Sequence, residues 1–396
     1  MKLNILFIIN GLGFSKNTGI GGSDKRAIEI VRNAKLLYPS SNFDIMTTES
    51  GYAIFSQQEK LETNYNIIKR PKWWPRIFEK TLLGRLFSYF YCTIFATHKI
   101  INLKKYDIVF STSDFFFDII PATISKTVNH QKIVAMIHHH IASPLKRKGD
   151  LLVNIFNFLS QQFSYWWIKN NFDSVFLYNT QEGRHISHLL LGSKKITFYF
   201  TENGIDREKI DNVKSKFKKY DACFVGGIRY SKGILDILNI WEIVIKNFPK
   251  SKIAIVGGGS NEIIKKFKSE IIIRNLTKNV YLTGPQSNQE TISIMKQSKI
   301  FLFPSHEEGW GIALNEALYC GLPTVCYNLP AFSIFKKFLY TSKIGHWQKL
   351  ASHMIKLLNS NVNKSKSTQS IKFASKFNWK SITVKDINFI NSINRG

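Results

Sequence analysis

Short apolar runs alternate along the whole chain with longer segments of helical periodicity. Runs that are apolar at every position are typical of strands buried on both faces, and helical segments between such strands indicate βαβ units in parallel sheets. Two such series predict an α/β chain with two domains, joined near Glu202–Asp206, where turn residues interrupt the pattern. The predicted strands are Ile5–Ile9, Asp44–Thr47, Ile108–Ser111, Lys132–Ile137, Ser174–Tyr178, Ala222–Val225, Ile253–Val256, Val280–Thr283, Ile300–Pro304 and Thr324–Tyr327.

Residues 71–105 form a separate segment that is rich in both cations and aromatic rings. One interpretation is a long helix packed on the first domain, because an aromatic stripe usually faces a core. The other is a segment in a membrane interface, with rings in the headgroup zone and cations on lipid phosphates. The pattern leaves both interpretations open. The rings available for insertion are Trp73, Trp74, Phe78, Phe87 and Phe90.

The composition excludes a disordered chain, since 44% of the 396 residues are apolar and 21% are charged. The 55 Lys and Arg residues against 27 Asp and Glu give a net charge of +28, which is spread over both halves. Such a surface attracts phosphates, acidic lipids or nucleic acid without choosing among them. Because no RRM, KH or helix-turn-helix signature is present, we expect no nucleic-acid partner.

Cysteine spacing and hydropathy indicate in which cellular compartment the protein is expected. Cys92, Cys223, Cys320 and Cys326 show no paired spacing, so we expect neither a disulfide framework nor a structural zinc site. The first apolar run is shorter than that of a signal peptide. No stretch reaches the roughly 18–20 apolar residues of a membrane span, and the nearest, Leu151–Ile168, is interrupted by Asn and Gln. We therefore expect a cytoplasmic protein without a span of its own.

The segment Ser305–Glu316, SHEEGWGIALNE, joins a strand-like run to a helix-like run. Gly309 and Gly311 would let the backbone approach a ligand closely. The N–H groups of Gly311 and Ile312 would be unpaired donors at the start of the helix, which favours a bound phosphate. The segment therefore predicts a phosphate seat.

Two carboxylates flank this predicted seat. Glu316 would lie about one turn into the helix, where it can accept hydrogen bonds from a diol such as ribose. Glu308 precedes the helix and can face a second hydroxylated group. Together they suit a nucleotide-sugar. The alternative is that one carboxylate caps the helix and the other is a solvated surface residue.

A second strand–loop–helix segment, Val225–Gly233, contains Gly227, Arg229 and Lys232. The two cations could neutralise a diphosphate leaving group, although surface cations are common on so basic a protein. The run Gly257–Gly259 is a strand-to-helix turn without the GxGxxG fingerprint, and no GxxxxGK[ST] loop occurs. We therefore expect neither NAD nor a P-loop.

In the first half, Gly21 and Gly22 follow the first strand, and they would let a substrate reach the next helix N-terminus or would simply form a flexible turn. His138, His139 and His140 follow the run KIVAMI. Neighbours in an extended chain point to opposite faces, so these histidines would not converge on one metal ion. A single histidine at the carboxyl end of a parallel strand suits a polar contact in the crevice.

Together these motifs resemble glycosyltransferase family 4, the retaining GT-B enzymes, over nearly the whole chain. The segments that carry the resemblance are GGSDKR, HHH, YNT, NGID, VGGIRYSKG, IVGGG and HEEGWGIALNEALYCGLPTV, and the last contains the E-x7-E pattern as Glu308 and Glu316. The resemblance implies a GT-B fold, with two Rossmann-like domains facing each other across a cleft. It implies that residues 1–202 bind the acceptor, that residues 203–372 bind the nucleotide-sugar, and that residues 373–396 form a helix crossing back to the first domain.

The resemblance also implies a role for each site residue. In many members an Arg precedes the motif Lys by five residues, where this chain has Gly227, and Arg229 is the candidate replacement. The implied catalytic residues are His138 (with His139 as the other candidate), Arg229, Lys232 and Glu308. The implied donor-binding residues are Gly21, Gly22, Gly227, Arg229, Lys232, Glu308, Gly309, Gly311, Ile312 and Glu316.

We therefore expect a retaining hexosyltransferase that needs neither metal nor cofactor and uses a UDP- or GDP-sugar. The expected acceptor is a glycan, lipid-linked at the inner face of the cell membrane, in the assembly of a surface polysaccharide or a glycoprotein glycan. The anionic membrane surface would be a further partner, reached by peripheral attachment. The alternatives are a GT-B protein without transferase activity, such as a sugar-nucleotide epimerase or an inactive partner subunit, and a basic nucleic-acid-binding protein.

Overall fold

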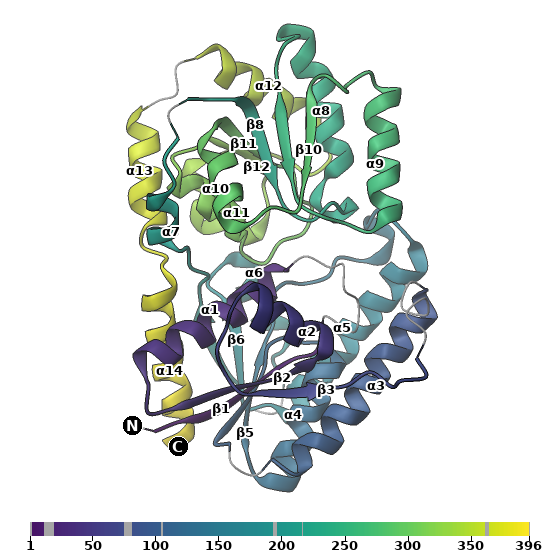
Figure 1. The fold of residues 1–396 in the computed structure, drawn as a ribbon, viewed down its shortest axis with the longest axis vertical. Coiled ribbons are helices and arrows are strands. Elements are labelled where there is room, and N and C mark those ends of the chain that lie inside the picture. The colour runs from purple at the N-terminus through teal and green to yellow at the C-terminus, as the bar shows by residue number, and fades with distance from the viewer. Residues whose placement is uncertain are drawn as a thin grey trace. The chain divides into compact units, whose positions relative to one another are not determined.

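A computed structural model describes residues 2–11, 20–74, 81–103, 106–192, 196–215, 217–360 and 364–395. The chain divides into two compact units (Figure 1). Unit 1 contains Met1–Asn203 together with Trp379–Gly396, and unit 2 contains Gly204–Asn378. The last helix therefore belongs to the same unit as the first strand.

Unit 1 is built on a seven-stranded parallel sheet of order β3-β2-β1-β4-β5-β6-β7. Its strands are β1 Asn4–Ile9, β2 Asn42–Thr48, β3 Tyr65–Ile68, β4 Ile108–Ser111, β5 Lys132–Met136, β6 Ser174–Tyr178 and β7 Thr197–Thr201. Its α-helices are α1 Gly22–Leu37, α2 Glu49–Tyr52, α3 Leu82–Ile101, α4 Phe116–Asn129, α5 Leu151–Asn171, α6 Gln181–Leu189 and α14 Trp379–Arg395.

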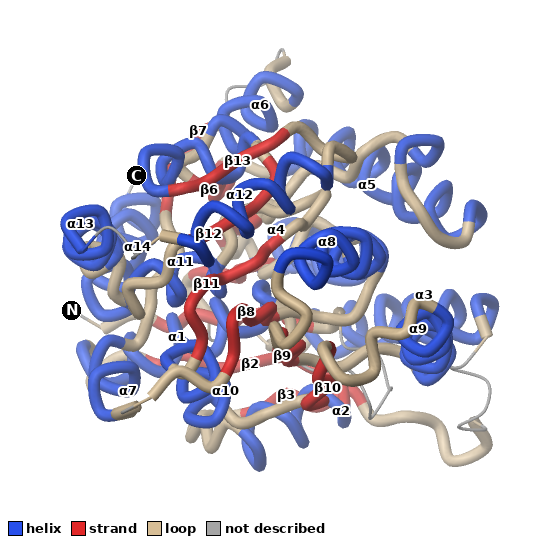
Figure 2. Tube along the Cα trace, turned by 90° about the horizontal axis from the view of Figure 1, so that it is seen from above, coloured by secondary structure: helices blue, strands red, loops and turns tan. Residues whose placement is uncertain are grey.

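Unit 2 is built on a six-stranded parallel sheet of order β10-β9-β8-β11-β12-β13, which can be followed in Figure 2. Its strands are β8 Tyr220–Val225, β9 Ile253–Val256, β10 Val280–Gly284, β11 Ser298–Phe303, β12 Thr324–Tyr327 and β13 Leu339–Ser342. Its α-helices are α7 Arg207–Asn212, α8 Ile234–Asn247, α9 Asn261–Ile273, α10 Asn288–Lys296, α11 Ile312–Tyr319, α12 Trp347–Asn359 and α13 Lys364–Ala374.

The prediction of two parallel α/β sheets is confirmed, and all ten predicted apolar runs fall in strands. Two of the predicted strands, Lys132–Ile137 and Ile300–Pro304, extend one residue too far, since β5 ends at Met136 and β11 ends at Phe303. The apolar-run criterion missed three strands, β3, β7 and β13. All three lie at sheet edges, where side chains are partly exposed and the sequence is correspondingly less apolar.

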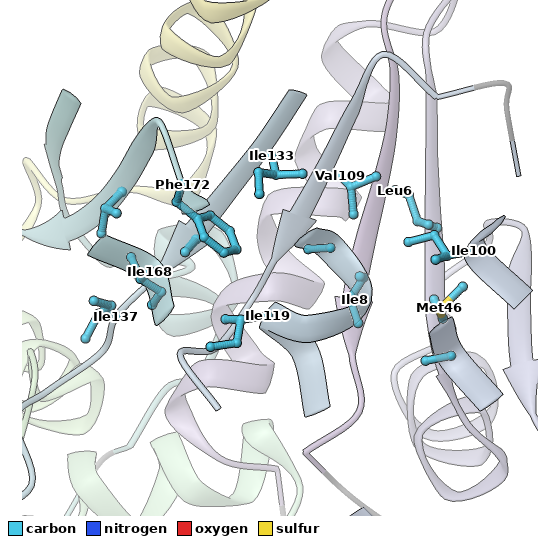
Figure 3. Close-up of a cluster of buried hydrophobic side chains, with 14 of the residues drawn as sticks. Leu6, Ile8, Met46, Ile100, Val109, Ile119, Ile133, Ile137, Ile168 and Phe172 are labelled. Carbon is cyan, nitrogen blue, oxygen red and sulfur yellow. The ribbon is translucent and has the colours of Figure 1, made fainter. Parts of the chain in front are cut away.

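A core of buried apolar side chains covers one face of the unit 1 sheet (Figure 3). The strands contribute residues such as Leu6 and Val109, and helices α3, α4 and α5 contribute Ile100, Ile119 and Ile168. These three helices therefore lie on the same face of the sheet. Helix α4 contacts both α3 and α5 and so lies between them.

Both interpretations of residues 71–105 can now be compared with the structure. Helix α3 packs on the core through its inner side, and Trp73, Phe87 and Phe90 are exposed. Trp74 is only 4% exposed and lies against the rings of Phe87 and Tyr91, so its expected availability for insertion is wrong. The remaining candidate, Phe78, lies outside the described residues. Within the described part of the chain, no helix has the length and hydropathy to cross a membrane.

Candidate functional site

The predicted donor-binding residues of unit 2 lie at the point where the order of the strands reverses. From β8 the chain winds outward through β9 and β10, and it then returns to place β11 on the other side of β8. Strands β8 and β11 are parallel neighbours, so the loops that follow them begin at the same edge of the sheet. In open α/β sheets ligands bind in the crevice at this switch point.

A close backbone approach joins the two loops. Gly233 has φ +69°, and a Cβ atom at this position would lie 2.0 Å from the carbonyl oxygen of Pro304. Only glycine can accept both that conformation and that contact. A backbone hydrogen bond from the His306 N–H to the Ser231 oxygen, 2.8 Å long, connects the same loops. The loops therefore form one structural element.

An ion pair connects the two loops on the side of the predicted site. The Lys232 Nζ atom donates to the Glu308 Oε1 atom over 2.5 Å, and both side chains are largely withdrawn from solvent. Lys232 and Glu308 were assigned to the diphosphate and to the donor sugar from separate sequence motifs. The fold thus brings a cation and a carboxylate from motifs 76 residues apart into direct contact.

A second polar contact fixes the orientation of the Glu308 loop. The His306 Nε2 atom lies 2.7 Å from the Oδ2 atom of Asp236, which is in the first turn of α8. The Tyr327 hydroxyl donates to the same oxygen over 2.9 Å. Asp236 is 2% exposed, so these charge-assisted bonds are sheltered from water. The sequence motifs gave no role to Asp236 or Tyr327.

Helix α11 begins at Ile312, directly after Gly311, which has φ +86°. A Cβ atom at Gly311 would lie 2.9 Å from the Phe332 ring, so this turn also depends on glycine. Trp310 is buried between the rings of Phe335 and Phe377, and it anchors the loop next to the helix N-terminus. The first-turn N–H groups of α11 have no earlier helical carbonyls to bond, as expected for an anion seat.

The remaining predicted residues of unit 2 lie on the same two segments. Glu316 is on α11 and is 7% exposed, and Gly309 is partly exposed in the preceding loop. Arg229 is exposed, and its Nε atom would lie 3.1 Å from a Cβ atom at Gly227. The Arg229 side chain therefore covers Gly227, where many members of the resembled family carry Arg.

The predicted residues of unit 1 lie just after β5 and at the start of α1. The Nε2 atom of His138 is 2.7 Å from the carbonyl oxygen of Thr112, which can only accept, so Nε2 carries the proton. The Nδ1 atom then accepts from the Tyr178 hydroxyl over 2.9 Å. Burial lowers the pKa of His138 to about 4, and the ring is neutral at pH 7. Both ring nitrogens are engaged within unit 1, an arrangement suited to positioning.

Gly21 and Gly22 stand at the start of α1, where Asp24 Oδ2 accepts a hydrogen bond from the Gly21 N–H. One turn further, the buried Arg26 forms an ion pair with Asp386 of α14. Arg26 also donates to the Thr201 hydroxyl and to the Asn203 side chain. Arg26 and Asp386 were not predicted, and together they attach the last helix to the first sheet.

The comparisons with known proteins concern unit 2 and the fold. Residues 206–376 match the family described as Glycosyl transferases group 1. The match covers nearly all of unit 2, and this unit belongs to that family. The fold is GT-B, since the chain aligns with the Anabaena protein HepE (Alr3699), crystallised with UDP and glucose, at a TM-score of 0.73 and 14% identity, over 98% of this chain and 100% of that one.

Two curated relatives of this chain carry specific activities in their names. The poly(glycerol-phosphate) alpha-glucosyltransferase of Bacillus subtilis is 32% identical over 161 residues, which is 40% of this chain and 23% of the relative. The GDP-mannose:cellobiosyl-diphosphopolyprenol alpha-mannosyltransferase of Xanthomonas campestris is 27% identical over 131 residues, 33% of this chain and 34% of the relative. The matched segments thus span about a quarter to a third of these relatives.

Proposed function

We propose that this chain is a retaining glycosyltransferase that transfers a sugar from a UDP- or GDP-sugar to a glycan acceptor. The observation that carries the proposal is the contact between Lys232 and Glu308 at the switch point of unit 2, beside the N-terminus of α11. A cation, a carboxylate and free helical N–H groups at one place match the chemistry of a diphosphate joined to a hydroxylated sugar.

Each residue has a definite task in this proposal. Departure of the nucleoside diphosphate builds negative charge on its phosphate oxygens, and groups fixed there beforehand lower the barrier. Lys232, Arg229 and the N–H groups of Gly311 and Ile312 supply that stabilisation. Glu316 accepts hydrogen bonds from the ribose diol, and Glu308 accepts them from the donor sugar while orienting Lys232.

His138 is given a positioning role in the same proposal. It is neutral at pH 7, and its Nε2 proton is directed to the Thr112 carbonyl oxygen. The ring is therefore suited to hold the end of β5 and the Tyr178 hydroxyl in place rather than to exchange protons. Gly21 and Gly22 would let a ligand approach the start of α1.

We further propose a lipid-linked acceptor, with the protein attached peripherally at the cytoplasmic face of the cell membrane. The mannosyltransferase relative has a diphosphopolyprenol-linked acceptor in its name. The net charge of +28 suits a surface that works beside anionic lipid. The product would enter the assembly of a surface polysaccharide or a glycoprotein glycan.

Product analysis tests this function. The protein is mixed with a panel of UDP- and GDP-sugars and a membrane extract, and the lipid fraction is examined by mass spectrometry. We expect one donor to add a single hexose mass to a lipid-linked glycan, and we expect Glu316→Ala to lower the addition about 10- to 150-fold at donor concentrations below the Kd. Isomerisation of the donor sugar without transfer would favour an epimerase, and no donor consumption with any sugar would overturn the proposal.

A further inference from the structure

Helix α5 of unit 1 buries several polar side chains beside its core residues Tyr165 and Ile168, and it exposes a row of apolar ones. The polar side chains of Asn154, Gln161 and Ser164 point inward and are at most 6% exposed. The outer side instead carries six apolar residues with exposed fractions between 36% and 67%. Five of these are spaced three or four positions apart and therefore form a stripe. The six residues are Leu151, Leu152, Ile155, Leu159, Phe163 and Trp166.

The inward polar side has a clear structural purpose. Gln161 donates to Asp114 and to the His139 carbonyl oxygen, and it accepts from the Ile141 N–H. Asn154 donates to the carbonyl oxygen of Arg147. These bonds hold the segment that follows β5, so the polar side of α5 cannot turn outward without breaking them. The apolar stripe is consequently fixed on the outside.

Helix α3 presents a similar stripe on the same side of the sheet. Its exposed apolar residues Leu83, Phe87, Phe90 and Ile94 follow one another at helical spacing. Helix α4 lies between α3 and α5: the Phe90 ring packs on Phe116 of α4, and the Trp167 Nε1 atom donates to Thr123 of α4. Because the inner sides of all three helices share one core, their outer sides point away from the sheet (Figures 1 and 3). We call the two stripes together the apolar face.

The charge around the apolar face identifies its partner. Residues 82–101 and 144–171 contain six Lys or Arg and a single acidic residue, Asp150, which caps α5. The exposed Lys146 and Lys148 stand just before α5, beside the exposed Leu145. A second copy of the chain would bring two cationic rims together, which costs free energy. An anionic bilayer offers both an apolar phase for the rings and a negative surface for the lysines.

We propose that the apolar face of α3 and α5 docks on a bilayer containing anionic phospholipid, with Lys146 and Lys148 on the headgroups. Aromatic rings such as Phe163 and Trp166 suit the interfacial zone, and large exposed apolar patches mark interaction surfaces. The purpose of docking, which is access to a lipid-linked acceptor, rests on the proposed function. The docking itself does not depend on that function.

Vesicle co-sedimentation tests the apolar contribution. The variant Leu159→Gln with Trp166→Gln changes two exposed residues of α5, and its matched control, Ile272→Gln with Ile273→Gln, changes two exposed residues of α9 in unit 2. We expect the α5 variant to lose at least about 10-fold in partitioning onto vesicles of phosphatidylcholine with phosphatidylglycerol, in low and in high salt, because apolar burial does not depend on Coulomb attraction. The α9 control should bind like the wild type.

The cationic contribution is tested in the same assay. We expect Lys146→Gln with Lys148→Gln to lose about 25-fold in partitioning at physiological salt and nothing at high salt, since each lysine near the surface contributes about fivefold and is screened by salt. The control, Lys246→Gln with Lys250→Gln, changes two exposed lysines of unit 2 and should leave partitioning within about twofold.

Three results would overturn the docking proposal. These are equal binding of the α5 variant and the wild type, no preference of the wild type for anionic vesicles, and a wild-type dimer in light scattering that the α5 variant dissociates. The last would identify a second copy as the partner. Nucleotide-sugar binding measured on the same variants should be unchanged. A wild type that binds vesicles but no nucleotide-sugar would overturn the proposed function and leave the docking proposal standing.

Discussion

Replacing Lys232 by Ala should weaken the binding of a nucleoside diphosphate, because the lysine supplies the cation nearest to the predicted phosphate seat. In the free protein Lys232 is paired with Glu308 over 2.5 Å, and the Glu308 side chain is 11% exposed. The substitution therefore has two effects. It removes a charge-assisted hydrogen bond to phosphate, and it leaves the Glu308 carboxylate facing the phosphates without its cation.

The expected magnitude follows from these two effects. A hydrogen bond to a charged group contributes about 1.5–3 kcal/mol, which corresponds to about a 10- to 150-fold increase in Kd. Repulsion from the unpaired carboxylate adds to this loss. The double variant Lys232→Ala with Glu308→Gln removes the repulsion, so it should bind the diphosphate more tightly than Lys232→Ala alone, by about fivefold if the repulsion costs about 1 kcal/mol.

Calorimetry with UDP and GDP isolates these effects, because a nucleotide without a sugar makes no contact that depends on the sugar-binding role of Glu308. Glu308→Gln alone should bind UDP or GDP at least as well as the wild type. The matched control is Lys209→Ala, which breaks the ion pair of another lysine of unit 2 with Asp206 and should leave the Kd unchanged. A Lys232→Ala protein with an unchanged melting temperature and a wild-type Kd would refute the reasoning, as would strictly additive effects in the double variant.

Three further predictions concern other residues. Glu316→Ala should raise the Kd for the nucleotide-sugar about 10- to 150-fold in calorimetry, since the ribose diol loses a charged acceptor, and an unchanged Kd in the folded variant would remove Glu316 from the site. Arg229→Ala should lower kcat by about tenfold if Arg229 replaces the cation missing at Gly227, and full activity would show that it does not. Burial raises the pKa of Asp118 to about 8, so its carboxyl stays protonated in the folded chain while it ionises in the unfolded chain above about pH 4. Stability from this group is present below pH 4 and lost as the pH rises toward 8. The melting temperature of Asp118→Asn, relative to that of the wild type at the same pH, should therefore rise between pH 5 and pH 8. A difference that stays constant with pH would contradict the assignment.

The interior of the fold could be predicted from the sequence because buried parallel strands have a simple signature. Every run that we predicted as a strand became one, and the two series of runs became two sheets. Three of the four edge strands lack this signature, since one side of each receives no neighbouring strand, whereas β10 at the remaining edge kept it. Thus β3, with the sequence YNII, and β13, with LYTS, did not stand out from the loops.

The candidate site was predictable to the extent that it is local. Residues at the start of a helix act through their neighbours in the chain, so Gly311 and Ile312 could be found from their motif. Contacts between distant segments could not. Arg26 and Asp386 are 360 residues apart, and His306 and Asp236 are 70 apart, and nothing in either local pattern specifies its partner.

The exposed side of helix α5 could not be predicted from the sequence either. Its sequence, with apolar residues interrupted by Asn, Gln and Ser, does not state which side faces inward. Periodicity alone would place the apolar side against the core, since burial of apolar area is the dominant driving force. The structure places Gln161 inward beside the core residues Tyr165 and Ile168, because Gln161 has specific partners there.

A crystal structure of the protein with a bound nucleoside diphosphate tests the central claim most directly. The account predicts the diphosphate in the crevice between the loops after β8 and β11, with a phosphate oxygen in hydrogen-bond distance of Lys232 and of the Gly311 or Ile312 N–H group. The ribose hydroxyls should contact Glu316. A nucleotide bound elsewhere on unit 2, or bound in the crevice with its ribose away from Glu316, would contradict it.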